Sequence, residues 1–342
     1  MNELAKDVLL GVSLFSDWRL YAADLSKSCA LEGLSPIRQP NSEDKQRVWL
    51  PYRELSEIMQ KFCDQLTAKC IELSRPWRCF NVDFTDGENH LRFRIQEMGN
   101  FYACKRILTS PPNLDELKGV PDTVKAAITS SVLKLTGGLV LMVGDTGTGK
   151  TMFASAALRE RLKKFGGYCL VLADPPEQPL GDDGGHYVGA NGYVDEVDVS
   201  EIGYTQALEH SLRSFPVGKT GSLFYGEIRS DSNAFDLISA SCDGHEVFST
   251  MHAMTPDAAL ERLISWCVRG GIPVDLVRSM LAQSLFCIIW HRVEYGRFIS
   301  AAYLVSETTR QRIREGHALP IKSTATQTPM VSVPNLQKPT KN

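Results

Sequence analysis

The chain has 342 residues, of which 43% are hydrophobic and 23% charged; these values indicate a globular protein of about two domains, not a disordered or membrane-spanning chain. Lys and Arg number 37 and Asp and Glu 40, and the net charge of -3 argues against a chain whose main partner is nucleic acid. The 9 cysteines contain no Cys-x-x-Cys pair, which favours reduced thiols in a cytoplasmic protein over a disulfide scaffold or a four-cysteine zinc site.

Residues 1–109 predict an N-terminal domain of mixed α+β structure. Residues 1–18 lack the basic start and the small-residue cleavage site of a signal peptide. Apolar residues recur at helical spacing over 54–73 and predict a helix. Two alternating stretches, 81–84 and 91–95, flank a turn and predict a hairpin whose second strand has apolar residues on one face and arginines on the other.

A second domain is expected over 135–316, after a linker and domain junction at 110–134 that begins with a Ser-Pro-Pro-Asn run. Apolar runs alternate with helical patterns, which predicts a mostly parallel α/β sheet. The segment 181–192 is rich in Gly and Asp and predicts a loop, and 317–342 predicts a disordered tail. The apolar runs are 139–143, 170–172, 223–225 and 247–250.

A phosphate-binding loop follows the first of these runs. Residues 144–151 fit G-x-x-x-x-G-K-[ST] between a strand and a helix, where backbone N–H groups and the helix N-terminus can surround phosphate oxygens. Lys150 would reach the β- and γ-phosphates of ATP, and the Thr151 hydroxyl would coordinate Mg²⁺. The residues of this predicted site are Gly144, Asp145, Thr146, Gly147, Thr148, Gly149, Lys150 and Thr151.

Acidic and histidine side chains follow the other predicted strands. Glu227 ends one apolar run, at the sheet edge where open α/β folds bind ligands, and could polarise the attacking water and contact Mg²⁺ through water. Asp174 and Glu177 follow the preceding strand and could face the same crevice; the alternative for all three is a solvated loop acid. His245 and His252 bracket a further strand, and His252 ends near the crevice, but their spacing places no third ligand for a metal.

These motifs, in this order, resemble those of the secretion ATPases of type II and type IV secretion and type IV pili. Asp174–Glu177 resembles the family's aspartate box, Gly226–Arg229 its Walker B box, and Gly244–His252 its histidine box. Residues 290–293 also follow the family pattern, and the likeness covers roughly residues 90 to 310. The chain looks most like the shorter retraction-type motors and their type IVB secretion and conjugation relatives.

The resemblance implies a RecA-like P-loop domain preceded by a smaller PAS-like α+β domain. It implies that Arg94 and Arg106 complete the nucleotide site, with Glu227, Lys150 and His252 as its other catalytic residues. By resemblance the protein would be a homohexameric ATPase that uses ATP and Mg²⁺. It would work at the cytoplasmic side of the inner membrane on the platform protein of a pilus or secretion machine, with no direct nucleic-acid partner.

Two departures from the family pattern leave alternatives open. Ala173 stands where the aspartate box usually begins with an acid, and Ser230 stands where an acid follows the Walker B arginine, with Asp231 next. Fewer carboxylates near Mg²⁺ would slow hydrolysis, so a weakly hydrolysing ring subunit is one alternative and a P-loop DNA translocase another. The cysteine motif of the longer type II enzymes is absent from the sequence, which favours the short motors.

Overall fold

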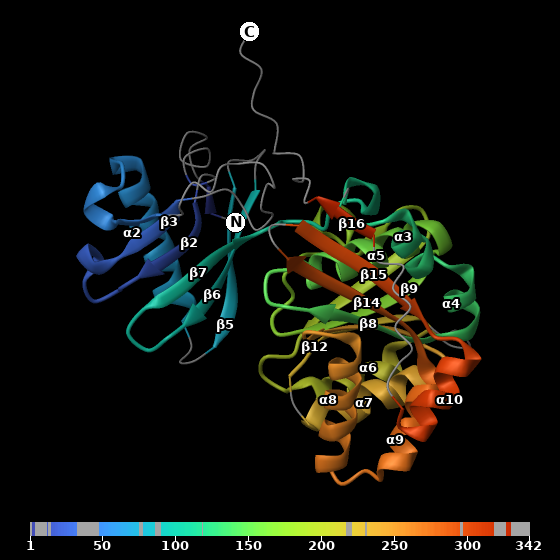
Figure 1. Ribbon diagram of the computed structural model, residues 1–342. Helices are drawn as coiled ribbons and strands as arrows, with labels where there is room; N and C mark the ends of the chain where they lie inside the picture. Colours follow the sequence, from blue (N-terminus) through green and yellow to red (C-terminus); the bar gives the residue numbers. More distant parts are fainter. Residues whose placement is uncertain are drawn as a thin grey trace. The chain divides into compact units, whose positions relative to one another are not determined.

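A computed structural model describes residues 2–3, 12, 15–32, 48–74, 78–85, 90–117, 119–216, 221–229, 231–294, 297–317 and 326–329. The chain forms two compact units, Met1–Ser110 and Pro111–Asn342 (Figure 1). In the parts that the structure describes, no helix is both long and apolar enough to cross a membrane.

The first unit is a sheet covered by one long helix. The strand order is β1-β5-β6-β7-β2-β3-β4, in which β1 runs parallel to β5 and the other neighbours are antiparallel. The helix is α2 (Glu57–Leu73). The strands are β1 (Asn2–Glu3), β2 (Phe15–Leu20), β3 (Cys29–Glu32), β4 (Val48–Pro51), β5 (Cys79–Thr85), β6 (His90–Glu97) and β7 (Tyr102–Ile107).

The helix and the hairpin predicted in this unit are both confirmed. Helix α2 begins after Ser56, whose hydroxyl accepts the backbone N–H of Met59 as an N-cap. Its apolar stripe includes Phe62, which packs against Phe93 of β6 at 5.5 Å between ring centres. Because Phe93 alternates with Arg94 along the strand, β6 presents its arginines on the face away from α2.

The second unit is built on a larger sheet with the order β10-β11-β9-β12-β13-β8-β14-β15-β16. From β11 to β14 all neighbours run parallel, as the alternating strand and helix pattern predicts. The strands are β8 (Gly138–Gly144), β9 (Gly167–Ala173), β10 (Tyr187–Val188), β11 (Gly192–Asp198), β12 (Ser222–Ile228), β13 (Glu246–His252), β14 (Leu285–Glu294), β15 (Arg297–Leu304) and β16 (Thr326–Pro329).

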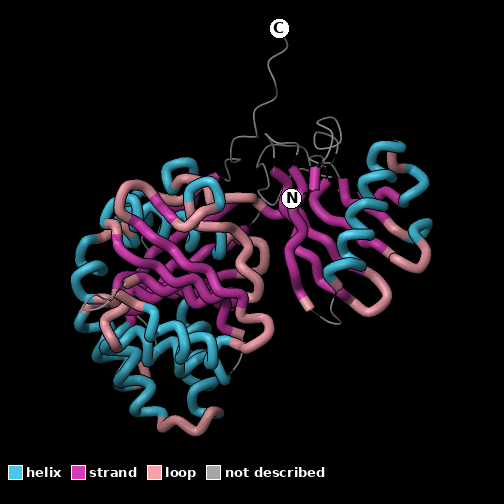
Figure 2. Tube along the Cα trace, turned by 180° about the vertical axis from the view of Figure 1, so that it is seen from behind, coloured by secondary structure: helices cyan, strands magenta, loops and turns pink. Residues whose placement is uncertain are grey.

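Helices cover both faces of this sheet, so its central strands are apolar on both sides (Figure 2). Along β8, Leu139, Leu141 and Val143 pack into one layer, and Val140 and Met142 into the other. The first layer is completed by α6 (Tyr204–Ser211), α7 (Asp231–Cys242), α8 (Pro256–Arg269), α9 (Val274–Ser284) and α10 (Glu307–Glu315), and the second by α3 (Asp122–Ile128), α4 (Ser131–Thr136) and α5 (Lys150–Phe165).

Three segments differ from the sequence expectation. The predicted linker 110–134 holds two short helices, and it packs Val124 and Leu133 in the core of the second unit. These helices are too short to show a clear helical period. The predicted loop 181–192 contains β10, and most of the predicted disordered tail lies outside the described residues, although Thr326–Pro329 pairs with β15 as the strand β16.

A buried ion pair joins α5 to the start of β13. Arg161 is 2% exposed and Glu246 3% exposed, and Arg161 Nε donates to Glu246 Oε2 at 2.7 Å. The same guanidinium donates to the backbone oxygens of Ile128 at 2.7 Å and Ser130 at 3.0 Å. The pair therefore ties the C-terminal end of α3 to the central sheet.

Glu246→Ala is expected to lower the free energy of unfolding by about 3–5 kcal/mol, because it leaves the guanidinium of Arg161 buried without its charge partner. Denaturant unfolding of the whole chain measures the loss. Glu209→Ala, on the exposed side of α6, is the matched control and should change stability by less than about 0.5 kcal/mol. A loss no larger than that of the control would show that the pair does not stabilise the fold.

Candidate functional site

The predicted phosphate-binding loop joins the end of β8 to the start of α5. Gly144 has φ +155°, and a Cβ there would lie 2.1 Å from the backbone oxygen of His291 on β14, so only glycine fits. Gly147 has φ +76° with no atom within 4 Å of the place a Cβ would take, which leaves the outer side of the loop open. The loop ends at the N-terminus of a 16-residue helix, where phosphate is favoured by the helix dipole.

Lys150 is folded back onto this loop. It is 6% exposed, and its Nζ donates to the backbone oxygens of Gly144 at 2.9 Å and Asp145 at 2.8 Å. The third partner is His252 Nδ1 at 3.2 Å. Burial lowers the pKa of Lys150 to about 8, although the charges of Glu227 and Asp145 oppose that shift. A bound phosphate would therefore replace partners that the ammonium already has, and it would also favour the charged form.

His252 links Lys150 to Glu227. Its Nε2 lies 2.9 Å from Glu227 Oε1, while its Nδ1 faces the Lys150 ammonium. Because an ammonium can only donate, Nδ1 is an acceptor and Nε2 carries the proton. Burial and the charge of Lys150 lower the pKa of His252, which is consistent with a neutral ring. The structure thus brings three of the predicted catalytic side chains, from α5, β12 and β13, into one hydrogen-bonded chain.

A second cation lies on Glu227. Arg229 Nε donates to Glu227 Oε2 at 3.0 Å, so the two carboxylate oxygens face different partners. The side chain of Glu227 is 19% exposed and that of Arg229 61% exposed. The sequence shows Arg229 only as the last residue of the Walker B box. Its ion pair with Glu227 has no distinct sequence signal, because two residues that are two positions apart at the end of a strand need not interact.

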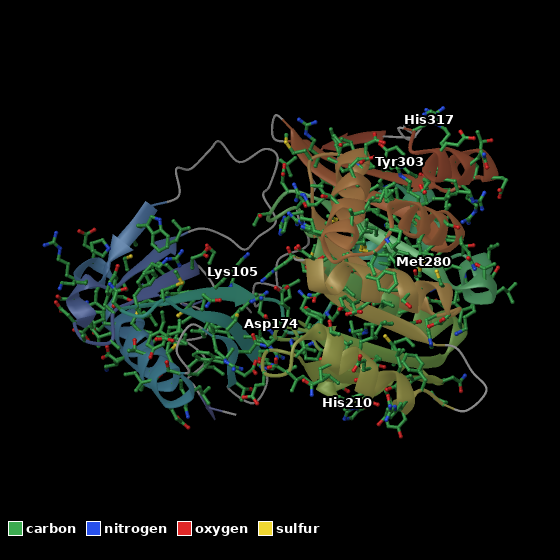
Figure 3. The ribbon with its side chains drawn as sticks, turned by 90° about the horizontal axis from the view of Figure 1, so that it is seen from below. Lys105, Asp174, His210, Met280, Tyr303 and His317 are labelled. Carbon is green, nitrogen blue, oxygen red and sulfur yellow. The ribbon has the colours of Figure 1, made fainter. Side chains whose placement is uncertain are left out.

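Other predicted site residues lie at the same edge of the sheet. Asp174 (labelled in Figure 3) directly follows β9, and Glu177 lies in the loop beyond it; both are half-buried. Thr151 lies in the first turn of α5, and Thr146 Oγ1 lies 3.5 Å from His252 Nδ1. The part that Asp174 and Glu177 take in nucleotide binding stays a prediction.

The residues present fit Mg²⁺ in the way that P-loops hold it. Among the described residues there is no group of three or more His, Cys, Asp or Glu side chains that could bind a metal alone. In a P-loop the metal depends on one hydroxyl, carboxylates and the nucleotide's own oxygens. Thr151 would supply the hydroxyl, and Glu227 would act through a water molecule.

The two departures from the family pattern have different surroundings. Ala173 is 8% exposed and packs in the core beside α5, so a carboxylate at this position would lose its water. Ser230 lies outside the described residues. Asp231 begins α7, and its Oδ1 lies 3.2 Å from Arg269.

The predicted arginines of the first unit lie on opposite faces of its sheet. Arg94 pairs with Lys105 (labelled in Figure 3) across β6 and β7, whereas Arg106 pairs with Phe93, which packs toward α2. Directly paired residues share a face, so Arg94 lies with Lys105 on the face away from α2, and Arg106 lies on the face of Phe93. Burial lowers the pKa of Arg106. The spacing of the two arginines in the sequence does not show this difference.

Comparisons with known proteins agree with the fold and the motifs. Residues 81–295 match the family described as type II/IV secretion system protein. The type IV pilus ATPase PilU of Pseudomonas aeruginosa is 30% identical over 189 residues, which cover 54% of this chain and 46% of PilU. A twitching motility protein of Neisseria gonorrhoeae is 24% identical over 255 residues, which cover 71% of this chain and 63% of that protein. The chain spans about half the length of most of the curated relatives that it matches most strongly.

Two solved structures share the fold. The pilus retraction motor PilT with bound ADP superposes with a TM-score of 0.60 at 20% identity, over 92% of this chain and 87% of PilT. The ATPase DotB of Legionella pneumophila gives 0.62 at 17% identity, over 90% and 84% of the two chains. These likenesses confirm the predicted fold class, a RecA-like P-loop domain after a smaller α+β domain. The family match over residues 81–295, more than half of the chain, establishes that the chain belongs to the type II/IV secretion system protein family.

Proposed function

We propose that this protein binds ATP with Mg²⁺ and hydrolyses it as the motor subunit of a pilus or secretion machine. The observation that carries the proposal is the hydrogen-bonded chain of Lys150, His252 and Glu227 beside an open phosphate-binding loop. A lysine that can reach phosphate and a carboxylate that can orient water are the two groups that phosphoryl transfer to water requires from a P-loop site.

The residues divide the chemistry between them. The loop amides and the N-terminus of α5 hold the phosphates, and Lys150 offsets the charge that grows on the transferred group. Glu227 accepts the proton of the attacking water. The neutral ring of His252 keeps the Glu227 carboxylate turned toward the loop. Thr151 would hold Mg²⁺, which would supply positive charge to offset that of the phosphates.

The assembly we propose is a homohexamer at the cytoplasmic side of the inner membrane, working on a membrane platform protein. Support comes from the names of the relatives, which include a type IV pilus ATPase and a pilus retraction motor. Retraction of a pilus, or the dynamics of a type IVB secretion or conjugation apparatus, are the two kinds of work that this resemblance favours.

Two measurements on the purified chain test the proposal. The first is the release of phosphate from ATP with and without Mg²⁺, and the second is the molecular mass in solution. We expect turnover that requires Mg²⁺ and a mass that rises when nucleotide is added. Nucleotide binding and assembly without turnover would instead favour a structural ring subunit. Absence of nucleotide binding would refute the proposal.

Arg94 is expected to act on the nucleotide site of a neighbouring subunit. It lies on the face of its sheet away from α2, where its Nε donates to Cys79 Sγ at 3.1 Å. Arg94→Ala and Lys150→Ala should each be nearly inactive alone, but a mixed ring should regain activity. With equal amounts, about a quarter of the interfaces combine an intact Arg94 with an intact Lys150.

The mixing experiment is checked by subunit exchange, which a fluorescence energy-transfer assay measures. Arg106→Ala is mixed with Lys150→Ala in the same way, although Arg106 lies on the other face of the same sheet. We propose that it too contributes to the shared site, as the family resemblance implies. Rings that exchange subunits but gain no activity with Arg94→Ala would contradict action between subunits.

A further inference from the structure

The strand that carries Glu227 contains a β-bulge just before that residue. Strand β12 pairs with β13 through Phe224 and Phe248, but the next pair is Glu227 with Thr250. Two residues of β12 therefore face one residue of β13, which is the pattern of a bulge. Bulges change the direction of a side chain at the end of a strand.

The bulge decides which way Glu227 points. Leu223 and Tyr225 pack into the helix layer of α7 and α8, and regular alternation would turn Glu227 into the same apolar layer. Because of the extra residue, Ile228 takes that buried position instead. The side chain of Glu227 therefore points away from this layer, toward His252 and the phosphate-binding loop, and is 19% exposed.

Hydroxyl groups of β13 hold the carbonyl groups of the bulge. Ser249 Oγ donates to the backbone oxygen of Tyr225 at 2.5 Å. Thr250 Oγ1 donates to the backbone oxygen of Gly226 at 3.2 Å. The bulge interrupts the backbone hydrogen bonds between β12 and β13. The two side-chain hydrogen bonds therefore help to hold the backbone of β12 at this point.

Tyr204, in the first turn of α6, packs against the bulged residues Tyr225 and Gly226. Its ring packs on that of Tyr225 at 4.8 Å between centres. A Cβ at Gly226 would lie 2.2 Å from Tyr204 Oη and 3.0 Å from the backbone oxygen of Leu172. Burial raises the pKa of Tyr204 to about 12, although the backbone N–H of Glu227 opposes that shift, so the hydroxyl stays protonated.

We propose that Tyr204 is a positioning residue for hydrolysis, which holds the backbone at Gly226 and Glu227 so that the carboxylate faces the attacking water. The inference rests on the proposed function, because it assigns a role in the same site. It also explains the glycine at 226, since the hydroxyl fills the space that any side chain there would need.

Tyr204→Phe tests the proposal by removing one oxygen atom. We expect kcat for ATP to fall about five- to tenfold, the value of one neutral hydrogen bond, while KM stays within about twofold. Tyr168→Phe is the matched control, because that half-buried hydroxyl is also hydrogen-bonded, to Asp195 at 3.0 Å, but lies at the start of β9. The control should keep the kcat of the wild type.

Two further variants separate positioning from simple stabilisation. In a Glu227→Gln background Tyr204→Phe should lower the residual kcat by less than about twofold, because the group that it positions has been lost. Gly226→Ala should inactivate the enzyme, and adding Tyr204→Phe should restore part of the rate, since the closest clash is removed. Thermal melting of each variant shows whether it is folded.

An unchanged kcat in Tyr204→Phe, or an equal fall in the Glu227→Gln background, would overturn the inference while leaving the proposed function intact. If the wild-type protein showed no Mg²⁺-dependent turnover of ATP, both the proposed function and the inference would be wrong. The two failures are therefore told apart by the wild-type measurement.

Discussion

Lys150→Ala will lower the rate of ATP hydrolysis by about 10²- to 10³-fold, the loss expected when one charged group is removed from the transition state. Lys150 is buried and its three N–H groups point at the loop and at His252, so its position is fixed, and a water molecule in its place would carry no positive charge. Steady-state phosphate release at saturating ATP measures the effect.

Lys163→Ala is the control for this substitution. Lys163 lies on the same helix, α5, but its exposed ammonium donates to Asn113 Oδ1 at 3.0 Å, away from the loop. Its removal should leave the rate within about twofold, as expected for an exposed residue with one weak bond. Turnover near that of the wild type in a folded Lys150→Ala protein would show that residues 144–151 are not a catalytic phosphate-binding loop.

Glu227→Gln will keep nucleotide binding and lower turnover by about 10²-fold or more, because an amide has the shape of the carboxylate but cannot take the proton of water. Gln can still accept the Nε2 proton of His252, so the local structure should survive. A fluorescent nucleotide measures binding, and phosphate release measures turnover on the same preparation.

The opposite result would assign Glu227 a different role. If Glu227→Gln bound nucleotide poorly but the bound fraction turned over at the normal rate, the residue would be structural. Glu209→Gln, an exposed residue on α6, makes the same chemical change away from the edge where the strands end. It should leave both binding and turnover unchanged.

Local patterns in the sequence were sufficient wherever neighbours along the chain decide the structure. The apolar run at 139–143 predicts a strand covered on both faces, and both helix layers do pack on it. The loop at 144–151 has its own chemistry, because a turn, a lysine and a helix start are adjacent in the chain. The hairpin at 81–95 and the helix at 54–73 likewise follow from residues a few positions apart.

The order of the strands, by contrast, depended on pairing between distant segments. Strand β8 lies between β13 and β14, which follow it by more than a hundred residues. The predicted linker and domain junction, 110–134, contains α3 and most of α4, because Val124 and Leu133 show their apolar role only against the sheet. Alternation along one strand also cannot tell how two strands are registered, so the opposite faces of Arg94 and Arg106 came from the ladder alone.

The sequence by itself determined the chemical groups of the site: the phosphate-binding loop, the acid that ends β12 and the histidine that ends β13. Parallel strands carry their last residues to one edge of the sheet, so the sequence also determined that these groups would gather there. Only the tertiary structure decided how they meet. The contact of His252 with Lys150 joins residues 102 positions apart, and the bulge that turns Glu227 depends on a tyrosine from α6 and hydroxyls from β13. Such contacts follow from the packing of whole elements, which no short stretch of sequence specifies.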